Sequence, residues 1–182
     1  MNEDQDLMTS GNTIRRVAIA ILQYQDKFLM QLRDDIPSIV HPGVWTMFGG
    51  HLEINEQPEI GVCRELQEEI GYVPQQISHF RTYADDLALG DRSLGDRSLG
   101  DQILGDRALN DRVIRDVFYG CLDVGLNMLQ LNEGWDMDLL SCPEIIKGSH
   151  YSAQALQERP IAPSHRQIML DFLSSPECRI NI

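Results

Sequence analysis

The segment 50–72 constrains the fold of this chain through three closely spaced glutamates. Glu65, Glu68 and Glu69 lie within five positions of one another. Pro58 suits the first turn of a helix and Gly71 suits the position after its end, so the sequence predicts a helix over residues 58–70. At about 100° per residue the three glutamates fall within an arc of about 100°. They therefore form one acidic face.

An apolar stripe adjoins this acidic face. Val62, Cys63, Leu66 and Ile70 fall between about 60° and 160° on the same angular scale, so the helix can pack on a sheet. Like charges at i,i+3 and i,i+4 destabilise a helix by a few tenths of a kcal/mol each. A hard divalent cation such as Mg²⁺, which prefers oxygen ligands, would offset that cost. The three glutamates taken alone favour the alternative, a solvated charged face.

The residues around the glutamates have a characteristic spacing. Five residues separate Gly50 from Glu56, and seven more precede the run Arg-Glu-Leu-Gln-Glu-Glu-Ile-Gly at 64–71. This pattern resembles the box of the Nudix hydrolases, Gly-x5-Glu-x7-Arg-Glu-U-x-Glu-Glu-x-Gly-U, in which U is a bulky aliphatic residue. The chain departs from the family at Tyr72, where an aliphatic residue is usual, and at Phe48, where proline is common. The acidic face is therefore interpreted as a metal site.

The resemblance implies roles for individual residues of the box. Arg64 is expected to pair with Glu56 and so to orient the loop against the helix. The backbone carbonyl of Gly50 is expected to bind Mg²⁺ or Mn²⁺ together with the three glutamates. The catalytic set that the resemblance implies is Glu56, Arg64, Glu65, Glu68 and Glu69.

Each candidate metal-binding or substrate-binding residue outside the box has an alternative role. Glu133 lies where some relatives place a further metal-binding acid, and a plain loop glutamate is the alternative. Arg33, at the end of the second predicted strand, resembles the basic residue that relatives use against substrate phosphate, and a surface charge is the alternative. Trp45 and Trp135 could stack on a base. Core packing is the alternative for Trp45.

The resemblance also implies a reaction. Family members hydrolyse a nucleoside diphosphate linked to another group. We therefore expect Mg²⁺-dependent hydrolysis of a pyrophosphate bond in a nucleoside triphosphate or a nucleoside diphosphate derivative, by in-line attack of a metal-activated water. Glu65 is one candidate for the general base. A nucleotide-sensing or binding module with little turnover is the alternative function, and an isomerase is a more remote one.

The remaining pattern predicts an α/β domain with a mixed sheet, and the resemblance implies an α/β/α sandwich. Alternating or β-branched runs predict strands, and amphipathic runs predict helices. Strands are expected at 13–24, 27–33, 75–83 and 113–124, with a short apolar segment at 45–48 and a further candidate strand at 126–131. Helices are expected at 142–147 and 163–174, in addition to 58–70.

A repeat of period five occupies residues 86–112, with LGDRSLGDRSLGD at its centre. Its period matches neither a helix nor a strand, so we expect a surface loop insertion made by tandem duplication. A repetitive β-coil and a partner-binding segment are the alternatives. Residues 1–12 are expected to be a mobile tail, and residues 13–182 a single domain.

Composition narrows the class of partner. The chain has 28 acidic and 15 basic residues and a formal charge of -13, which disfavours nucleic acids and anionic membranes. A small nucleotide substrate can still bind if divalent cations mediate the contact. No apolar run approaches the roughly 18 residues of a membrane span. The four scattered cysteines predict reduced, mostly buried thiols and a cytoplasmic protein, and the resemblance makes a homodimer an open possibility.

Overall fold

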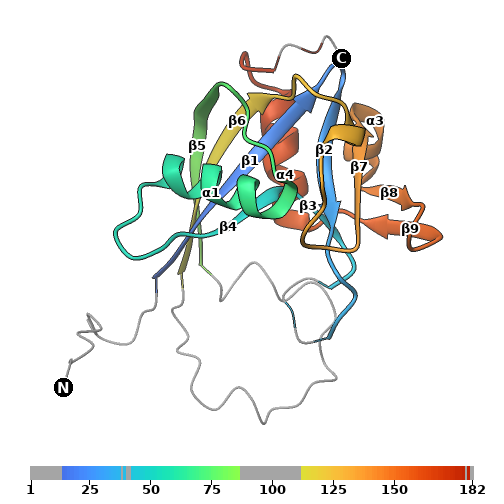
Figure 1. The fold of residues 1–182 in the computed structure, drawn as a ribbon, viewed down its shortest axis with the longest axis horizontal. Helices are drawn as coiled ribbons and strands as arrows, with labels where there is room; N and C mark the ends of the chain where they lie inside the picture. Colours follow the sequence, from blue (N-terminus) through green and yellow to red (C-terminus); the bar gives the residue numbers. More distant parts are fainter. Residues whose placement is uncertain (1–13, 38, 40–41, 87–111, 179, 181–182) are drawn as a thin grey trace.

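The structure is a computed structural model that describes residues 14–37, 39, 42–86, 112–178 and 180 (Figure 1). The predicted tail at 1–12 and nearly all of the period-five repeat lie outside these residues. The elements in chain order are β1 (Ile14–Tyr24), β2 (Lys27–Leu32), β3 (Trp45–Thr46), β4 (Phe48–His51), α1 (Pro58–Ile70), β5 (Ile77–Asp86), β6 (Arg112–Cys121), the 3-10 helix η1 (Leu126–Met128), β7 (Asp136–Ser141), α3 (Cys142–Lys147), β8 (Ser149–Ser152), β9 (Gln157–Pro160) and α4 (Pro163–Leu173).

Strand β1 is the centre of a mixed seven-stranded sheet. It pairs in parallel with β6, through Ile19 and Val117 among others, and antiparallel with both β2 and β4. Strand β5 pairs with β6 at one edge, while β3 and β7 pair with β2 on the other side of β1. The predicted mixed sheet is confirmed. Strands β8 and β9 form a separate hairpin.

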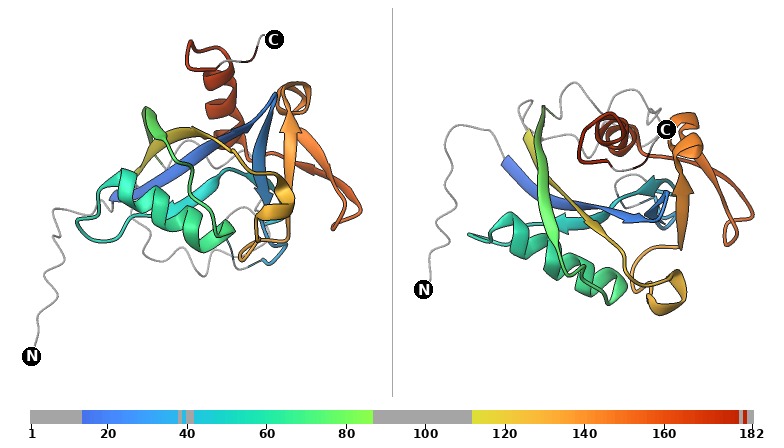
Figure 2. Two further views of the ribbon diagram at one scale, coloured as in Figure 1. Left: turned by 45° about the horizontal axis from the view of Figure 1, so that its top comes forward. Right: turned by 90° about the horizontal axis from the view of Figure 1, so that it is seen from above.

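The alternation of β1 divides the core into two layers. Ala18, Ala20 and Leu22 belong to the apolar cluster that includes Leu66 of α1. Ile19 and Ile21 belong to the cluster that includes Ile168, Met169 and Phe172 of α4. Figure 2 shows α1 and α4 on opposite faces of the sheet. The α/β/α sandwich expected from the sequence is therefore present.

The predicted elements agree with the structure where the periodicity was strong. Helices α1 and α3 have the predicted bounds, and α4 ends one residue earlier. The candidate strand at 126–131 was wrong, because residues 126–128 form η1, in which the Met128 N–H donates to the Gly125 carbonyl. Strands β7, β8 and β9 were missed: each is only four to six residues long and rich in polar residues.

The four cysteines are all free thiols. The expectation that most are buried was wrong, since Cys142 is buried while Cys121 is exposed and the other two are half-buried. No helix in the described part of the chain is long and apolar enough to cross a membrane.

Two glycines fix the ends of the segment that carries the acidic face. Gly49 in β4 has φ +121°, and a Cβ there would lie 2.2 Å from the Ala18 carbonyl oxygen of β1. Gly71 follows α1 with φ +65°, and its N–H donates to the Gln67 carbonyl. Both conformations favour glycine. At Gly71 a Cβ would meet no atom within 4 Å, so only the backbone conformation opposes a side chain.

We predict that Gly71→Ala lowers the free energy of unfolding by about 1 kcal/mol, because a Cβ is strained in the left-handed region. Urea unfolding followed by circular dichroism measures the change. Gly71→Asn is the matched control, since asparagine tolerates this conformation better than alanine. Equal losses in the two variants would show that the backbone conformation is not the cause.

Candidate functional site

The three glutamates of helix α1 are buried to different extents. Its apolar residues Val62 and Leu66 are fully buried against the sheet, which fixes the rotation of the helix. Glu69 is then 5% exposed, whereas the side chains of Glu65 and Glu68 are 16% and 56% exposed. The acidic face therefore runs from the margin of the core out to solvent.

The buried Glu69 carboxylate is held from two strands. One oxygen accepts from Gln31 Nε2 of β2 at 3.0 Å, and the other accepts from the Gly49 N–H of β4 at 2.8 Å. Burial raises the pKa of Glu69 to about 7, while the two hydrogen bonds oppose the shift and the charges of Glu65 and Glu133 add to it. The pair Gln31 and Gly49 thus fixes the position of this carboxylate.

Arg64 joins the acidic face to the loop before α1. Its Nε and Nη2 donate to the two oxygens of Glu56, both at 3.0 Å, and this guanidinium lowers the pKa of the Glu56 carboxyl. Its Nη1 donates to Glu65 at 2.8 Å and to Glu68 at 3.1 Å, and Nη2 also donates to the His51 carbonyl. The expected Arg64–Glu56 pair is therefore present, and the same guanidinium neutralises part of the acidic face.

The three glutamates do not converge on one point. Among the residues that the structure describes, no three His, Cys, Asp or Glu side chains are grouped so that they could hold a metal ion. Arg64 accounts for the separation, since its Nη1 lies between the carboxylates of Glu65 and Glu68, while Glu69 turns toward Gln31 and Gly49.

The residues present nevertheless suit a hard cation. A Cβ at Gly50 would lie 2.6 to 2.7 Å from the Glu65 carboxylate, so this glycine lets the carboxylate pack directly on the backbone of β4. Carboxylate and carbonyl oxygens are the donors that this face offers, and they are the ligands that Mg²⁺ prefers, but the side chains would have to turn toward a common point to bind one ion. Glu65, Glu68, Glu69 and the Gly50 carbonyl are the residues that would hold it.

The loop after η1 approaches the same helix. Asn132 donates from its backbone N–H to the Glu69 carbonyl and from its side chain to the Glu68 carbonyl, both at 2.8 Å. Glu133 is exposed beside this link, and its charge contributes to the raised pKa of Glu69. The structure therefore brings Glu133 near the acidic face.

The two predicted substrate residues differ in exposure. Arg33 is half-buried at the end of β2, where its N–H donates to the Val44 carbonyl. Trp45 is fully buried, donates through Nε1 to the His150 carbonyl at 3.1 Å and packs edge-on against the His150 ring. A ring with no exposed surface cannot stack on a base. The substrate-binding role predicted for Trp45 is therefore wrong, and the core-packing alternative holds.

Sequence reasoning missed the residues that orient the glutamates, namely Gln31, Gly49 and Asn132. Gln31 had a signal, because it is a polar residue within the apolar run of β2, and the structure buries it to 3% exposure. Gly49 acts through its backbone N–H, and Asn132 acts through its backbone N–H and its side-chain amide. Backbone contacts of this kind leave little trace in a sequence.

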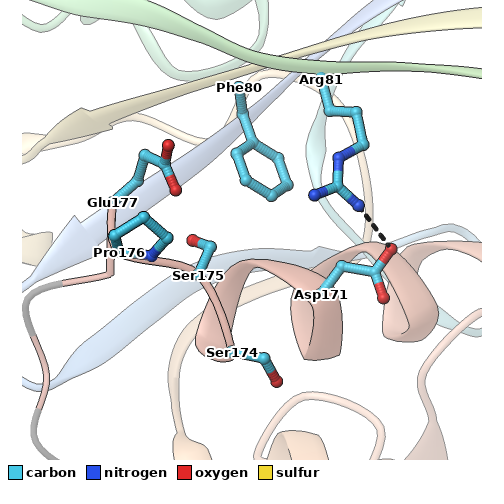
Figure 3. A pocket seen from close by; sticks show the side chains of 7 residues that line it. All are labelled: Phe80, Arg81, Asp171, Ser174, Ser175, Pro176 and Glu177. Carbon is cyan, nitrogen blue, oxygen red and sulfur yellow. Dashed lines mark hydrogen bonds and ion pairs between the residues drawn. The ribbon is translucent and has the colours of Figure 1, made fainter.

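A shallow hollow lies elsewhere on the molecule. Phe80 and Arg81 of β5 face Asp171 of α4 and residues 174–177 across it (Figure 3). Arg81 lies 3.5 Å from Asp171, which also accepts from the Tyr83 hydroxyl. These residues lie at the α4 side of the sheet, so the hollow is separate from the acidic face of α1.

Comparison with known proteins places this geometry in a family. A family model described as NUDIX domain matches residues 13–136, more than half of the chain. The chain belongs to the NUDIX family. Within the matched range lie all the residues of the acidic face, together with Glu133 and Arg33.

Solved structures resemble the chain over most of its length. The NUDIX domain of Shewanella oneidensis NrtR, complexed with ADP ribose, gives a TM-score of 0.59 at 16% identity, covering 95% of this chain and 93% of that one. A bifunctional NMN adenylyltransferase/ADP ribose pyrophosphatase from Francisella tularensis, complexed with AMP and a manganese ion, gives 0.53 at 20% identity, covering 92% of this chain and 43% of that one. At these identities the likeness shows the fold.

A protein from Proteus vulgaris named 8-oxo-dGTP diphosphatase is 50% identical to the chain over 44 residues. The match covers 24% of this chain and 39% of that protein. The chain thus spans about two fifths of the length of this relative.

We predict that the free energy of unfolding falls between about pH 4.5 and 7 in metal-free buffer. The native Glu69 carboxyl, with its pKa raised from 4.5 to about 7, keeps a proton that the unfolded chain releases, so rising pH favours unfolding. The contribution of this group is about 3 kcal/mol. Urea unfolding at pH 5 and pH 8 measures it.

Glu69→Gln is the comparison for this pH dependence. The substitution also removes a hydrogen-bond acceptor, but that loss is independent of pH, so the slope is the readout. We expect the variant to lose less stability than the natural protein between pH 5 and 8. An unchanged slope would assign the pH dependence to another group.

Proposed function

We propose that this protein is a hydrolase that cleaves a pyrophosphate bond in a nucleoside triphosphate, or in a nucleoside diphosphate linked to another moiety, in a Mg²⁺- or Mn²⁺-dependent reaction. The observation that carries the proposal is the acidic face of α1, with Glu65 packed on the Gly50 backbone, in a chain of the NUDIX family. A solvated charged face would not need a buried third carboxylate held by two donors.

A divalent cation, when bound, would neutralise diphosphate charge and lower the pKa of a water molecule. The net charge of -13 would repel a diphosphate without such a cation. Glu65, Glu68, Glu69 and the Gly50 carbonyl are the proposed ligands, and Glu133 is the proposed additional acid from the loop before β7.

The protein's own residues supply orientation. Arg64 holds Glu56 and the His51 carbonyl, which fixes the loop between β4 and α1 against the helix. Gln31 and Gly49 hold Glu69 from the sheet. These contacts fix helix α1 and the loop before it, so the backbone that carries the carboxylates stays in place during the reaction, which lowers the barrier.

The proton of the attacking water must pass to a carboxylate. Glu65 is the proposed general base, since it lies on the rigid helix beside Gly50 and keeps part of its surface exposed. Arg33, half-buried at the end of β2, is proposed to contact the substrate phosphate. Its guanidinium would offer paired donors to phosphate oxygens.

The names of similar proteins support the substrate class. ADP ribose accompanies the Shewanella domain, and the Proteus protein is named for 8-oxo-dGTP. Both compounds carry a nucleoside with a 5′-diphosphate unit. A nucleotide of this general class is therefore the proposed substrate.

We predict that phosphate, pyrophosphate or nucleoside monophosphate is released from at least one member of a panel of nucleoside triphosphates and nucleoside diphosphate derivatives with Mg²⁺. Glu65→Gln, Glu68→Gln and Glu69→Gln should each lower kcat by about 100-fold or more, since each removes a proposed cation ligand. Glu59→Gln is the matched control, because Glu59 is exposed on the same helix outside the acidic face. The proposal fails if no compound turns over with Mg²⁺ or with Mn²⁺ in its place, or if Glu69→Gln keeps the full rate.

The binding-module alternative makes a different prediction in the same experiment. A nucleotide-sensing module would bind Mg²⁺ and a nucleotide, detected by calorimetry, without product release from any member of the panel. That combination would replace the hydrolase proposal with a binding function for the same fold.

A further inference from the structure

Trp135 is the second tryptophan that could stack on a base, and its backbone lies close to residues that support the acidic face. It precedes β7, and its N–H donates to the Leu32 carbonyl of β2 at 2.8 Å. The neighbouring Gly134 packs on Gln31, since a Cβ there would lie 3.0 Å from Gln31 Oε1. Gln31 in turn donates to Glu69. A chain of direct contacts therefore connects the Trp135 backbone to the proposed cation ligands.

The Trp135 ring is covered by a cation on one side. The Arg159 guanidinium of β9 lies over the ring, 5.1 Å from its centroid. Figure 1 shows β9 and its hairpin partner β8 beside β7, which places Arg159 within reach of the start of β7. Trp135 nevertheless keeps 36% of its surface exposed, whereas Trp45 has none. Arg159 thus occupies one face of the indole ring, while part of the Trp135 surface remains open to solvent.

Arg159 itself is held in place. Its Nη2 donates to Asp35, in the loop after β2, at 2.9 Å, and its side chain is only 16% exposed. Gly43 in the same loop allows this approach, because a Cβ there would lie 2.7 Å from Arg159 Nη1. A largely buried guanidinium is costly unless it is paired. The pairing with Asp35 therefore fixes the Arg159 guanidinium that lies over the Trp135 ring.

The contact between Trp135 and Arg159 favours the binding of a flat ligand over a purely structural role. A contact that only stabilised the fold would be most stable with the indole fully buried, because burial of apolar surface is the main stabilising term. Here a rigid aromatic surface stays partly exposed, and its backbone is linked through Gly134 and Gln31 to Glu69, which is proposed to hold the cation at the diphosphate. Stacking on such a surface accommodates every base, since each base has a π-face.

We propose that Trp135 stacks on the base of the nucleotide, and that Arg159, held by Asp35, is a positioning residue that fixes the indole. The inference deepens the proposed function and rests on it for the reaction, but not for binding. Base stacking predicts that the site distinguishes phosphates that carry a base from those that do not, with little discrimination among bases.

Tryptophan fluorescence tests the stacking without turnover. AMP and GMP are titrated in buffer with Mg²⁺, and ribose 5-phosphate serves as the probe without a base. The chain has two tryptophans and Trp45 is fully buried, so quenching by a stacked base must come from Trp135. We expect saturable quenching by both monophosphates, none by ribose 5-phosphate, and none in Trp135→Leu. Quenching that persists in Trp135→Leu, or no quenching of the natural protein, overturns the proposal.

Steady-state kinetics on a turned-over substrate provide the second readout. Trp135→Leu should raise KM about tenfold with kcat unchanged, because stacking contributes equally before and during the reaction. Tyr151→Leu is the matched control, an exposed aromatic on the adjacent strand β8, and should leave KM unchanged. A fall in kcat without a rise in KM for Trp135→Leu would overturn the stacking role.

A double-variant comparison tests the positioning role of Arg159. Arg159→Gln should weaken AMP binding less than Trp135→Leu does, and the double variant should bind no more weakly than Trp135→Leu alone. Asp35→Asn should resemble Arg159→Gln. Additive losses in the double variant would mean that Arg159 contacts the nucleotide itself, and would overturn the positioning role.

Failure of this inference is distinguishable from failure of the proposed function. Trp135-dependent quenching by AMP in a protein that hydrolyses nothing would reject the hydrolase and keep the stacking. Turnover that is unaffected in Trp135→Leu would keep the hydrolase and reject the stacking.

Discussion

The Arg64 guanidinium is the interaction on which the arrangement of the acidic face depends. Three carboxylates, those of Glu56, Glu65 and Glu68, accept hydrogen bonds from it, as does the His51 carbonyl at the end of β4. Without a positive charge these groups would repel one another across a helix turn. Because the guanidinium neutralises part of this negative charge, helix α1, the loop before it and β4 can pack together. A bound divalent cation would neutralise more of the same charge.

The sequence predicted the rigid part of the site well. Strong local signals determined α1: the 3.6-residue apolar period, Pro58 at its start and Gly71 after its end. The pairing of Arg64 with Glu56 followed from spacing through a family resemblance. Both depend on residues close together in the chain, where local pattern and final structure agree.

Long-range contacts were beyond the reach of sequence reasoning. Trp45 was placed in the substrate site from its chemistry, but the packing of β3 against α3 and β8 decides its burial. Strands β8 and β9 are too short and polar to show a period of two, so Arg159 could not be placed beside Trp135. Gln31 meets Glu69 across 38 residues of chain, through sheet pairing that no local pattern encodes.

The backbone of Gly49 has a consequence for how this protein can vary. Its N–H supports Glu69, while its missing side chain makes room for the Ala18 carbonyl. Loss of the proposed cation ligand and loss of the fold can therefore be separated by mutation. Exchanging Glu69 removes a carboxylate and leaves the strand pairing, whereas any side chain at position 49 disturbs the central strand and the carboxylate together. A descendant that is selected only for its fold would therefore retain Gly49 even after other residues had replaced its glutamates.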